Sequence, residues 1–295
     1  MDIHRHISII VNPFSGNGFS SRKSDILKRK LEEWKFNPEF YAIRKNTSPQ
    51  DFILSEKKAG SKFFVAIGGD GTVNMVARHL IGSDCKLCII PNGSGNGLAR
   101  HLNIPRTFSE SVSMIMSNRI KEIDYGLVNE VPFFCTSGLG FDARVAHLFS
   151  EKSKRGLINY LKIILIEFIS YKGEEYQFIL PDKKFTVNAF LVTLANAAQY
   201  GNNAFISPES SLDDGLLDLC RISSFPSFFA PILGLQLLSK RIGKSKYYDM
   251  TRITEVTIRR KSKGWMHIDG DPILLPKTIN YRIIPGGLKV VLPGS

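Results

Sequence analysis

The sequence predicts a Rossmann-like α/β domain followed by a largely antiparallel β domain. The chain has 295 residues, about twice the length of a typical single domain. In residues 1–125 short apolar runs alternate with segments of helical period, a pattern typical of successive βα units that build a parallel sheet. In residues 126–295 most of the apolar runs are strand-like and follow one another directly. We therefore predict two domains, 1–125 and 126–295.

Four strands and two helices are predicted in the first domain. Apolar runs of strand length stand at 7–11, 39–43, 63–67 and 87–90. Apolar residues at helical spacing follow the first and third of these runs, namely Leu27, Leu31 and Trp34, and then Val73, Val76, Ala77 and Leu80. This order of strands and helices predicts a doubly wound sheet.

The second domain is predicted from shorter strand-like runs. They stand at 133–136, 176–180, 190–194, 216–222, 256–259, 279–284 and 288–292. The last two are separated by Pro285-Gly286-Gly287, which favours a hairpin turn. Two helical segments, 157–170 and 227–239, interrupt the strands.

Composition excludes several classes of protein. Hydrophobic residues make up 43% and charged residues 22% of the chain, which is typical of a globular protein. No apolar run approaches the roughly 18 residues that a membrane-spanning helix needs, and the N-terminus lacks the apolar segment of a signal peptide. A cytoplasmic location is therefore expected.

Net charge indicates an anionic partner. The chain carries 39 Lys and Arg against 27 Asp and Glu, a formal charge of +12. Nucleic acid, an anionic membrane surface and nucleotide phosphates would all be attracted. No motif of interleaved aromatic and basic residues stands out, so we do not expect nucleic-acid binding. The four cysteines fit buried thiols better than disulfides or a zinc set, because the Cys85 and Cys88 pair has no second pair beside it.

Glycine-rich loops follow three of the predicted strands. They read NPFSGNG at 12–18, GGDGT at 68–72 and NGSGNG at 92–97. Glycine lets backbone amides approach an anion, and a helix N-terminus adds partial positive charge. One such loop alone more often simply turns the chain. Because the carboxyl ends of neighbouring parallel strands meet at one crevice, the three together predict a nucleotide site.

The residues of this predicted nucleotide site come from all three loops. They are Asn12, Ser15, Gly16, Gly68, Gly69, Asp70, Gly71, Thr72, Gly93, Ser94, Gly95 and Asn96. The carboxylate of Asp70 would repel phosphate unless a cation joined them, which predicts magnesium. No GxxxxGK[ST] motif is present, which excludes a Walker-type phosphate loop.

These loops resemble the nucleotide-binding motifs of the diacylglycerol kinase catalytic domain family, which includes sphingosine, ceramide and bacterial lipid kinases. Three later segments resemble further motifs of that family in the same order: SGLGFD at 137–142, DDGLLD at 213–218 and DGDP at 269–272. The set spans nearly the whole chain and is therefore specific. GGDGT alone also occurs in NAD kinases.

The resemblance implies a fold, a reaction and roles for single residues. The fold would be an α/β domain like that of NAD kinase and diacylglycerol kinase, then an antiparallel β-sandwich, with ATP in the cleft between them. Asp70 matches an acid that helps hold magnesium and ATP, and Asp124 matches an acid of the same network. Asp214 matches a structural magnesium ligand, completed by the carbonyl groups of Ser211 and Leu216. Asp271 occupies the place of the general base.

The resemblance is imperfect at three positions. Met75 stands where many members have glutamate, Gly97 stands where diacylglycerol kinases often have aspartate, and Asp271 replaces the usual glutamate. His267, close to the DGDP turn, is expected to be an ordinary strand residue.

The sequence therefore predicts a lipid kinase that uses ATP and magnesium to phosphorylate a hydroxyl of a diacylglycerol-like or sphingoid lipid. Two alternatives stay open: a kinase with a soluble substrate, as in NAD kinase, and a nucleotide- or lipid-binding protein that has lost catalysis. The family also suggests a homodimer.

Two segments bear on contact with a membrane. In 157–170, Ile163 and Ile166 fall on the polar side of the helix, where either protein or lipid would cover them. Segment 227–239 runs into a basic cluster, which would be either a solvated loop or a contact with an anionic bilayer, made by Lys240, Arg241, Lys244 and Lys246. We expect transient, peripheral membrane association.

Overall fold

The chain folds into two compact units. The structure is a computed structural model that describes residues 6–16, 18–44, 47–150, 163–164, 166–168 and 170–294. Unit 1 comprises Met1–Ile123 and Gly286–Ser295, and unit 2 comprises Asp124–Pro285. Two strands, β5 (Ile120–Val128) and β16 (Thr278–Val291), have residues in both units. The predicted domain boundary at 125/126 lies within β5.

Unit 1 is built on a parallel sheet, as the sequence predicts. Its strand order is β2-β1-β3-β4, with the C-terminal part of β16 beside β4. The bounds agree with the four predicted apolar runs to within two residues: β1 (His6–Val11), β2 (Asn37–Ala42), β3 (Phe63–Gly68) and β4 (Lys86–Pro91). Nearly all of β1, β3 and β4 is buried, which explains why these strands are continuous apolar runs.

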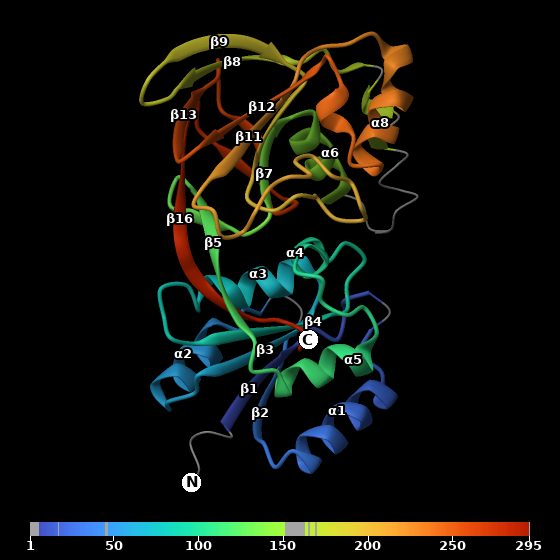
Figure 1. Ribbon diagram of the computed structural model, residues 1–295, viewed down its shortest axis with the longest axis vertical. Helices are drawn as coiled ribbons and strands as arrows, with labels where there is room; N and C mark the ends of the chain where they lie inside the picture. Colours follow the sequence, from blue (N-terminus) through green and yellow to red (C-terminus); the bar gives the residue numbers. More distant parts are fainter. Residues whose placement is uncertain are drawn as a thin grey trace. The chain divides into compact units, whose positions relative to one another are not determined.

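Helices cover this sheet. They are α1 (Ser21–Glu33), α2 (Gln50–Lys58), α3 (Asp70–Arg78), α4 (Gly97–His101), α5 (Phe108–Ser113) and the 3₁₀ helix η2 (Met114–Met116). The predicted Leu27 and Leu31 are the buried residues of α1. Helix α1 lies beside α5, and α2 lies beside α3 (Figure 1). The chain leaves β1 and β3 in opposite directions along the sheet, so the loops after these strands meet at the topological switch point.

Unit 2 contains two antiparallel sheets. One has the strand order β12-β11-β10-β7-β14-β15. Its strands are β7 (Thr136–Gly140), β10 (Leu191–Ala195), β11 (Leu217–Ile222), β12 (Tyr248–Ile253), β14 (Gly264–Ile268) and β15 (Asp271–Leu275). The other sheet contains β16 and part of β5, joined by β6 (Val131–Phe133), β8 (Glu174–Ile179), β9 (Lys184–Ala189) and β13 (Glu255–Arg259).

The two sheets of unit 2 share one core, which makes this unit a β-sandwich. Tyr176, Phe178 and Ile258 of one sheet and Leu194 and Met266 of the other belong to the same cluster of buried side chains. The predicted fold class, an α/β domain followed by an antiparallel β domain, is thus confirmed.

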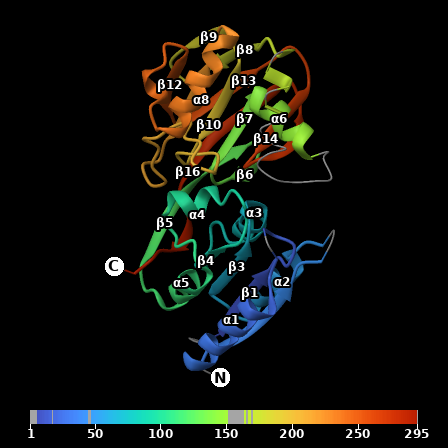
Figure 2. The ribbon, with the colours of Figure 1, turned by 90° about the vertical axis from the view of Figure 1, so that its right-hand side faces the viewer.

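A second cluster lies under the helices of unit 2. They include α6 (Phe141–Ser150), α8 (Ala230–Leu238) and the 3₁₀ helices η3 (Ser227–Phe229) and η4 (Ile242–Lys244). Phe141 of α6 and Leu233 of α8 pack with Leu191 and Cys220 of the six-stranded sheet. Figure 2 shows α6 and α8 in front of these strands.

The predicted hairpin at Pro285-Gly286-Gly287 is wrong. The residues on both sides of it form the single strand β16. Residues 278–282 pair with β13 and residues 289–290 pair with β4, so the two halves pair with different strands rather than with each other. Gly286 does have a positive φ of 60°, but this bend does not reverse the chain.

Several strands escaped sequence prediction. Strands β9, β12 and β15 lie at the edges of their sheets. In β9 and β12 polar residues alternate with apolar ones and leave no continuous apolar run, and the short apolar run of β15 directly follows the DGDP turn. The predicted run 133–136 is divided between β6 and β7. Strands β5 and β14 were missed as well.

Of the predicted helix 157–170, residues 157–162, 165 and 169 lie outside the described residues. The described ones are helical. Ile163 is buried, whereas Ile166 is 67% exposed. Within the part of the chain that is described, no helix has the length and apolar character needed to cross a membrane.

The four cysteines are free and buried, as predicted. Burial raises the pKa of the Cys88 and Cys220 thiols to about 12 in each case. A raised pKa keeps a thiol protonated at all lower pH values, and the protonated form is a poor nucleophile.

We therefore expect the native protein at pH 8 to react with Ellman's reagent much more slowly than the urea-unfolded chain, which should expose all four thiols at once. The measurement is the rate of thionitrobenzoate release with and without urea. Rapid reaction of a native thiol would contradict the buried positions.

Candidate functional site

The loops after β1 and β3 are joined by a side-chain hydrogen bond across the switch point of unit 1. The amide of Asn12 donates to the hydroxyl of Thr72 (3.0 Å). Asn12 also orders its own loop, because its Oδ1 accepts from the backbone of Phe14 (3.0 Å) and its carbonyl oxygen accepts from the hydroxyl of Ser15 (2.9 Å). Asn12 and Thr72, both predicted site residues, thus hold two of the three loops together.

Asn92 connects the third loop to the first. Its Nδ2 donates to the carbonyl and the hydroxyl oxygen of Ser15 (3.0 and 3.1 Å) and to the carbonyl of Gly18 (3.2 Å). The backbone amide of Asn92 donates to the carbonyl of Gly68 at the start of the second loop (2.7 Å). The structure therefore brings all three predicted loops into one cluster within unit 1.

Glycine is required where these loops touch. A Cβ atom on Gly16, which has a φ of +55°, would lie 2.1 Å from the carbonyl oxygen of Asn92. A Cβ atom on Gly93 would lie 2.5 Å from the Cα atom of Gly69. Both distances are far below contact distance, so the loops approach this closely only because side chains are absent.

We expect the substitution Gly93→Ala to destabilise unit 1 by about 1–3 kcal/mol, the usual cost of overpacking. Gly71→Ala is the matched control, because a Cβ atom there meets nothing within 4 Å. Urea unfolding followed by circular dichroism measures both variants. Equal unfolding midpoints for the two would contradict the close approach of the loops.

Asp70 joins the second loop to the third. Its Oδ2 accepts from the amide of Asn96 (2.7 Å) and its Oδ1 accepts from the amide of Gly97 (2.6 Å). These amides stand at the start of α4, where a negative charge is favourable. The role of Asp70 in holding magnesium stays a prediction.

Two residues of the cluster were not among the predicted site residues. Asn92 is one, and Lys23 in the first turn of α1 is the other. The ammonium group of Lys23 donates to Oδ1 of Asn92 (2.5 Å) and to the carbonyl of Gly18 (3.0 Å). A lysine one helical turn after a glycine-rich loop is the signal that could have indicated this cation.

The second acid of the predicted network, Asp124, is a buried residue of unit 2. Its Oδ2 accepts from the amide of Gly215 (2.7 Å), and its backbone amide donates to the carbonyl of Leu212 (2.6 Å). The side-chain amide of Asn196 donates a hydrogen bond to the backbone carbonyl of Asp124 (2.9 Å). Asp124 therefore anchors the loop 211–216, which contains the predicted metal ligands.

Within that loop, the predicted ligand Asp214 is exposed. Its Oδ1 accepts from the amide of Leu216 (3.1 Å), while the hydroxyl of Ser211 donates to Asp213 (2.5 Å). Among the described residues, no group of three or more His, Cys, Asp and Glu is arranged to hold a metal ion. One carboxylate and two backbone carbonyls would be a different kind of site, so the set of Ser211, Asp214 and Leu216 stays a prediction.

The DGDP turn is fixed by its first aspartate. The carboxylate of Asp269 accepts from three successive backbone amides, those of Phe134 (2.8 Å), Cys135 (2.7 Å) and Thr136 (2.9 Å). Asp269 itself has a left-handed φ of 50°. Two residues later, Asp271 begins β15 and is exposed to solvent. The turn therefore holds one aspartate by its carboxylate and presents the next to solvent.

His267 is a buried residue of β14, as expected for a strand residue. Its Nδ1 accepts from the amide of Gly270 in the turn (3.3 Å), so Nε2 carries the proton and faces Oδ2 of Asp142 (3.2 Å). Asp142 also accepts from the hydroxyl of Thr193 (2.9 Å). The turn is thus supported by a chain of polar groups, of which His267 and Thr193 are buried and Asp142 is partly buried.

Comparison with known proteins shows which family shares these features. The family model of the diacylglycerol kinase catalytic domain matches residues 6–128, and that of the YegS C-terminal NAD kinase β-sandwich-like domain matches residues 136–292. A Pseudomonas aeruginosa protein named "Probable lipid kinase YegS-like" is 28% identical over 80% of this chain and 78% of its own length. An uncharacterised Synechocystis protein is 30% identical over 73% of this chain, and the match spans about half, 53%, of that protein.

Solved structures show the same fold. A diacylglycerol kinase from Bacillus anthracis has a TM-score of 0.73 at 18% identity, with 98% of this chain and 97% of that chain covered. An NAD kinase from Archaeoglobus fulgidus in complex with ATP has a TM-score of 0.54 at 12% identity, with 97% and 94% covered. Because both family models match and the loops at 12–18, 68–72 and 92–97 form one cluster, the chain belongs to the diacylglycerol kinase catalytic domain family, together with the YegS-like lipid kinases.

Proposed function

We propose that this protein uses ATP and magnesium to transfer the γ-phosphate to a hydroxyl group of a lipid. Family membership supports a kinase that acts on lipids. Beyond family membership, we propose the phosphate donor, the metal and the residues that bind phosphate, hold the metal and accept the proton.

The observation that carries the proposal is the cluster of three glycine loops in unit 1. Phosphoryl transfer needs little covalent chemistry from the protein, but it does need firmly positioned phosphates. The bonds of Asn12 to Thr72 and of Asn92 to Ser15 fix the loops against one another. Glycine contacts leave the backbone amides accessible to phosphate oxygens.

Charge at this cluster suits a triphosphate. Lys23 places an ammonium group at the first and third loops, and lysine binds phosphate as a compact point charge. Asp70 and the N-terminus of α3 lie at the second loop. Magnesium bound with ATP would neutralise phosphate charge, and carboxylates are the hard ligands that it prefers. Asp70 is the residue of unit 1 that we propose to hold it.

Asp271 is proposed to orient the lipid hydroxyl and to accept its proton. An exposed carboxylate on a rigid turn is accessible to a substrate that approaches from solvent. Asp269 and His267 supply that rigidity through their bonds to residues 134–136 and to Gly270.

The test is an assay with labelled ATP and magnesium. The acceptors are mixed micelles of diacylglycerol, monoacylglycerol, phosphatidylglycerol, ceramide or a sphingoid base, with soluble NAD offered in parallel. We expect label in the lipid extract, which EDTA abolishes. Label in NAD alone would favour a soluble-substrate kinase, and ATP binding without transfer to any acceptor would indicate a protein that has lost catalysis. Either outcome would overturn the proposal.

A further inference from the structure

We propose that helix α8 of unit 2 and the basic segment after it form a docking surface for an anionic lipid bilayer. We call this surface the α8 face and define it by Phe228, Ile232, Leu235 and Leu238, together with the basic residues Lys240, Arg241, Lys244 and Lys246. It adds a partner to the proposed kinase function, and it can be tested without ATP or a substrate.

Helix α8 is apolar on two opposite sides, although only one of them is needed for folding. Leu233 is buried and Leu237 packs against the same cluster, so this side anchors the helix to unit 2. Ile232, Leu235 and Leu238 fall within an arc on the other side, and they are 45%, 67% and 57% exposed. The preceding Phe228 is 79% exposed. A helix that only covers a core should carry polar residues on its outer side, yet α8 has the sequence APILGLQLL, without any charged residue.

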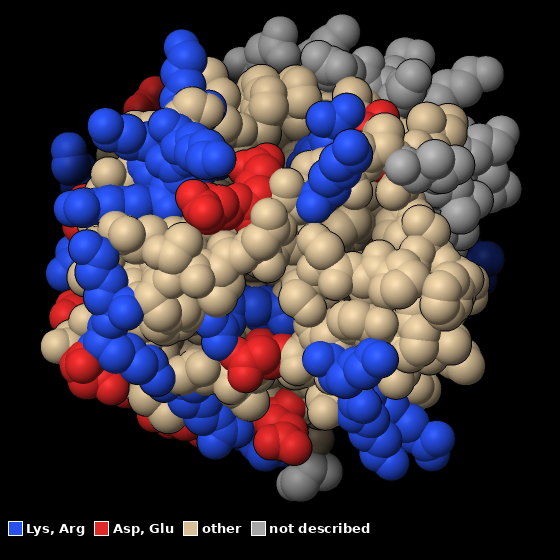
Figure 3. Space-filling model, turned by 90° about the horizontal axis from the view of Figure 1, so that it is seen from above, with Lys and Arg blue, Asp and Glu red and all other residues tan. Residues whose placement is uncertain are grey.

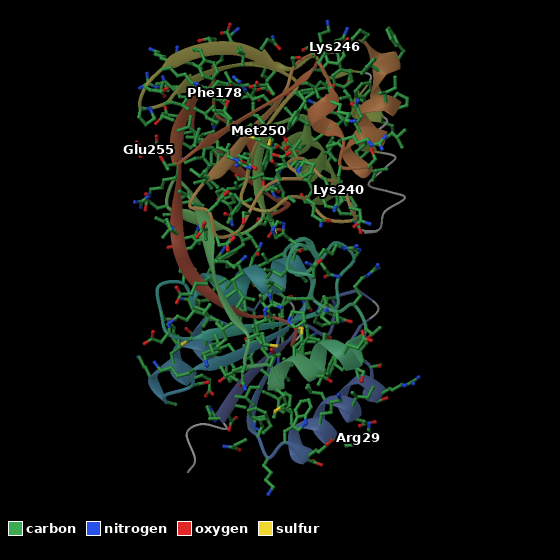
Figure 4. All side chains as sticks on the ribbon, in the orientation of Figure 1. Arg29, Phe178, Lys240, Lys246, Met250 and Glu255 are labelled. Carbon is green, nitrogen blue, oxygen red and sulfur yellow. The ribbon has the colours of Figure 1, made fainter. Side chains whose placement is uncertain are left out.

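The residues after the helix supply positive charge. Lys240, Arg241, Lys244 and Lys246 are all exposed. The buried Ile242 in η4 fixes this segment to the same cluster that anchors α8. Figure 4 labels Lys240 and Lys246 in this part of unit 2. In Figure 3, Lys and Arg side chains stand beside a largely uncharged area to the right of the centre, together with a few Asp and Glu side chains.

Negative charge is missing from the same stretch of sequence. No Asp or Glu stands between Asp218 and Asp249, although 22% of the whole chain is charged. The basic residues of the α8 face therefore have no acidic neighbours in sequence to neutralise them. Exposed apolar side chains beside basic ones are the combination that binds the interface of an anionic membrane.

Charge also indicates which of two partners, a bilayer or a second copy of the chain, binds the α8 face. In a symmetric dimer the same patch would face itself, so the basic residues of both copies would come together and repel. An anionic lipid surface instead attracts them, and its acyl region accepts Ile232, Leu235 and Phe228. We therefore assign the surface to a lipid bilayer.

Vesicle sedimentation tests this assignment. The protein, without nucleotide, is mixed with phosphatidylcholine vesicles that either contain or lack one quarter phosphatidylglycerol. We expect binding to the anionic vesicles, with a clear decrease as salt is added. The variant Arg241→Gln/Lys244→Gln/Lys246→Gln should bind about 100-fold more weakly, and Ile232→Ser/Leu235→Ser should bind at least about tenfold more weakly.

Matched variants in unit 1 control for charge and apolarity. Lys28→Gln/Arg29→Gln/Lys58→Gln removes the same charge from exposed positions. Leu54→Ser and Met116→Ser remove side chains that are 40% and 51% exposed. These controls should bind like the unaltered protein. Equal binding of both vesicle types, equal loss in the controls, or a dimer in light scattering that Ile232→Ser/Leu235→Ser dissociates would overturn the proposal. A failure of lipid phosphorylation in micelles would leave this result untouched, so the two proposals fail separately.

Discussion

Replacing Asp271 with asparagine is expected to lower the rate of lipid phosphorylation about 10²–10⁴-fold, the usual contribution of a general base. Asparagine has nearly the same shape as aspartate, but it cannot accept the proton of the attacking hydroxyl. Asp271 is exposed, so its replacement should leave the unfolding midpoint and the affinity for ATP nearly unchanged. The measurement is kcat for label transfer to lipid, with ATP affinity determined by calorimetry.

Asp271→Glu is the informative companion, because glutamate is the residue that the family usually has here. It should retain activity if the turn tolerates one more methylene group. Near-normal kcat in Asp271→Asn would remove Asp271 from the mechanism while leaving the nucleotide site of unit 1 in place.

Much of the fold could be predicted because buried parallel strands have an unmistakable sequence. The strands β1, β3 and β4 are runs of Ile, Val, Leu and Phe that require burial on both faces. Strand β16 could not be predicted as one element. The sequence Pro285-Gly286-Gly287 is compatible with a hairpin, and only the choice of pairing partners, β13 for one half and β4 for the other, shows that the chain continues.

The candidate site shows a similar division. The glycine loops were predicted because glycine itself marks a close backbone approach. Two of the residues that join the loops, Asn92 and Lys23, were not predicted because their hydrogen bond links positions 69 residues apart, and only the place of the lysine after the first loop marks it locally. In the sequence, Asp269 was recognised only as part of the DGDP motif. Its bonds to the amides of residues 134–136, more than 130 residues earlier in the chain, form because β7 and β14 pair in one sheet.

That long-range contact predicts the largest effect on stability. The substitution Asp269→Ala removes the acceptor of three backbone amides at residues 134–136, all of which belong to buried residues. Each buried amide left without a partner costs about 1–3 kcal/mol. We therefore expect unit 2 to lose about 3 kcal/mol or more, measured by urea unfolding.

Two further variants separate this explanation from a general effect of removing charge. Asp269→Asn keeps one acceptor oxygen and should lose less stability than Asp269→Ala. Asp182→Ala, at an exposed position of unit 2, should change stability by less than about 0.5 kcal/mol. If Asp269→Ala unfolds at the same urea concentration as Asp182→Ala, the three amide bonds do not hold the turn. The same bonds fix the backbone two residues before Asp271, so any fraction of Asp269→Ala that remains folded should also phosphorylate lipid more slowly. A folded, fully active Asp269→Ala would show that the turn keeps its geometry without these bonds, and the rigidity attributed to it would then have to come from His267 and Asp142.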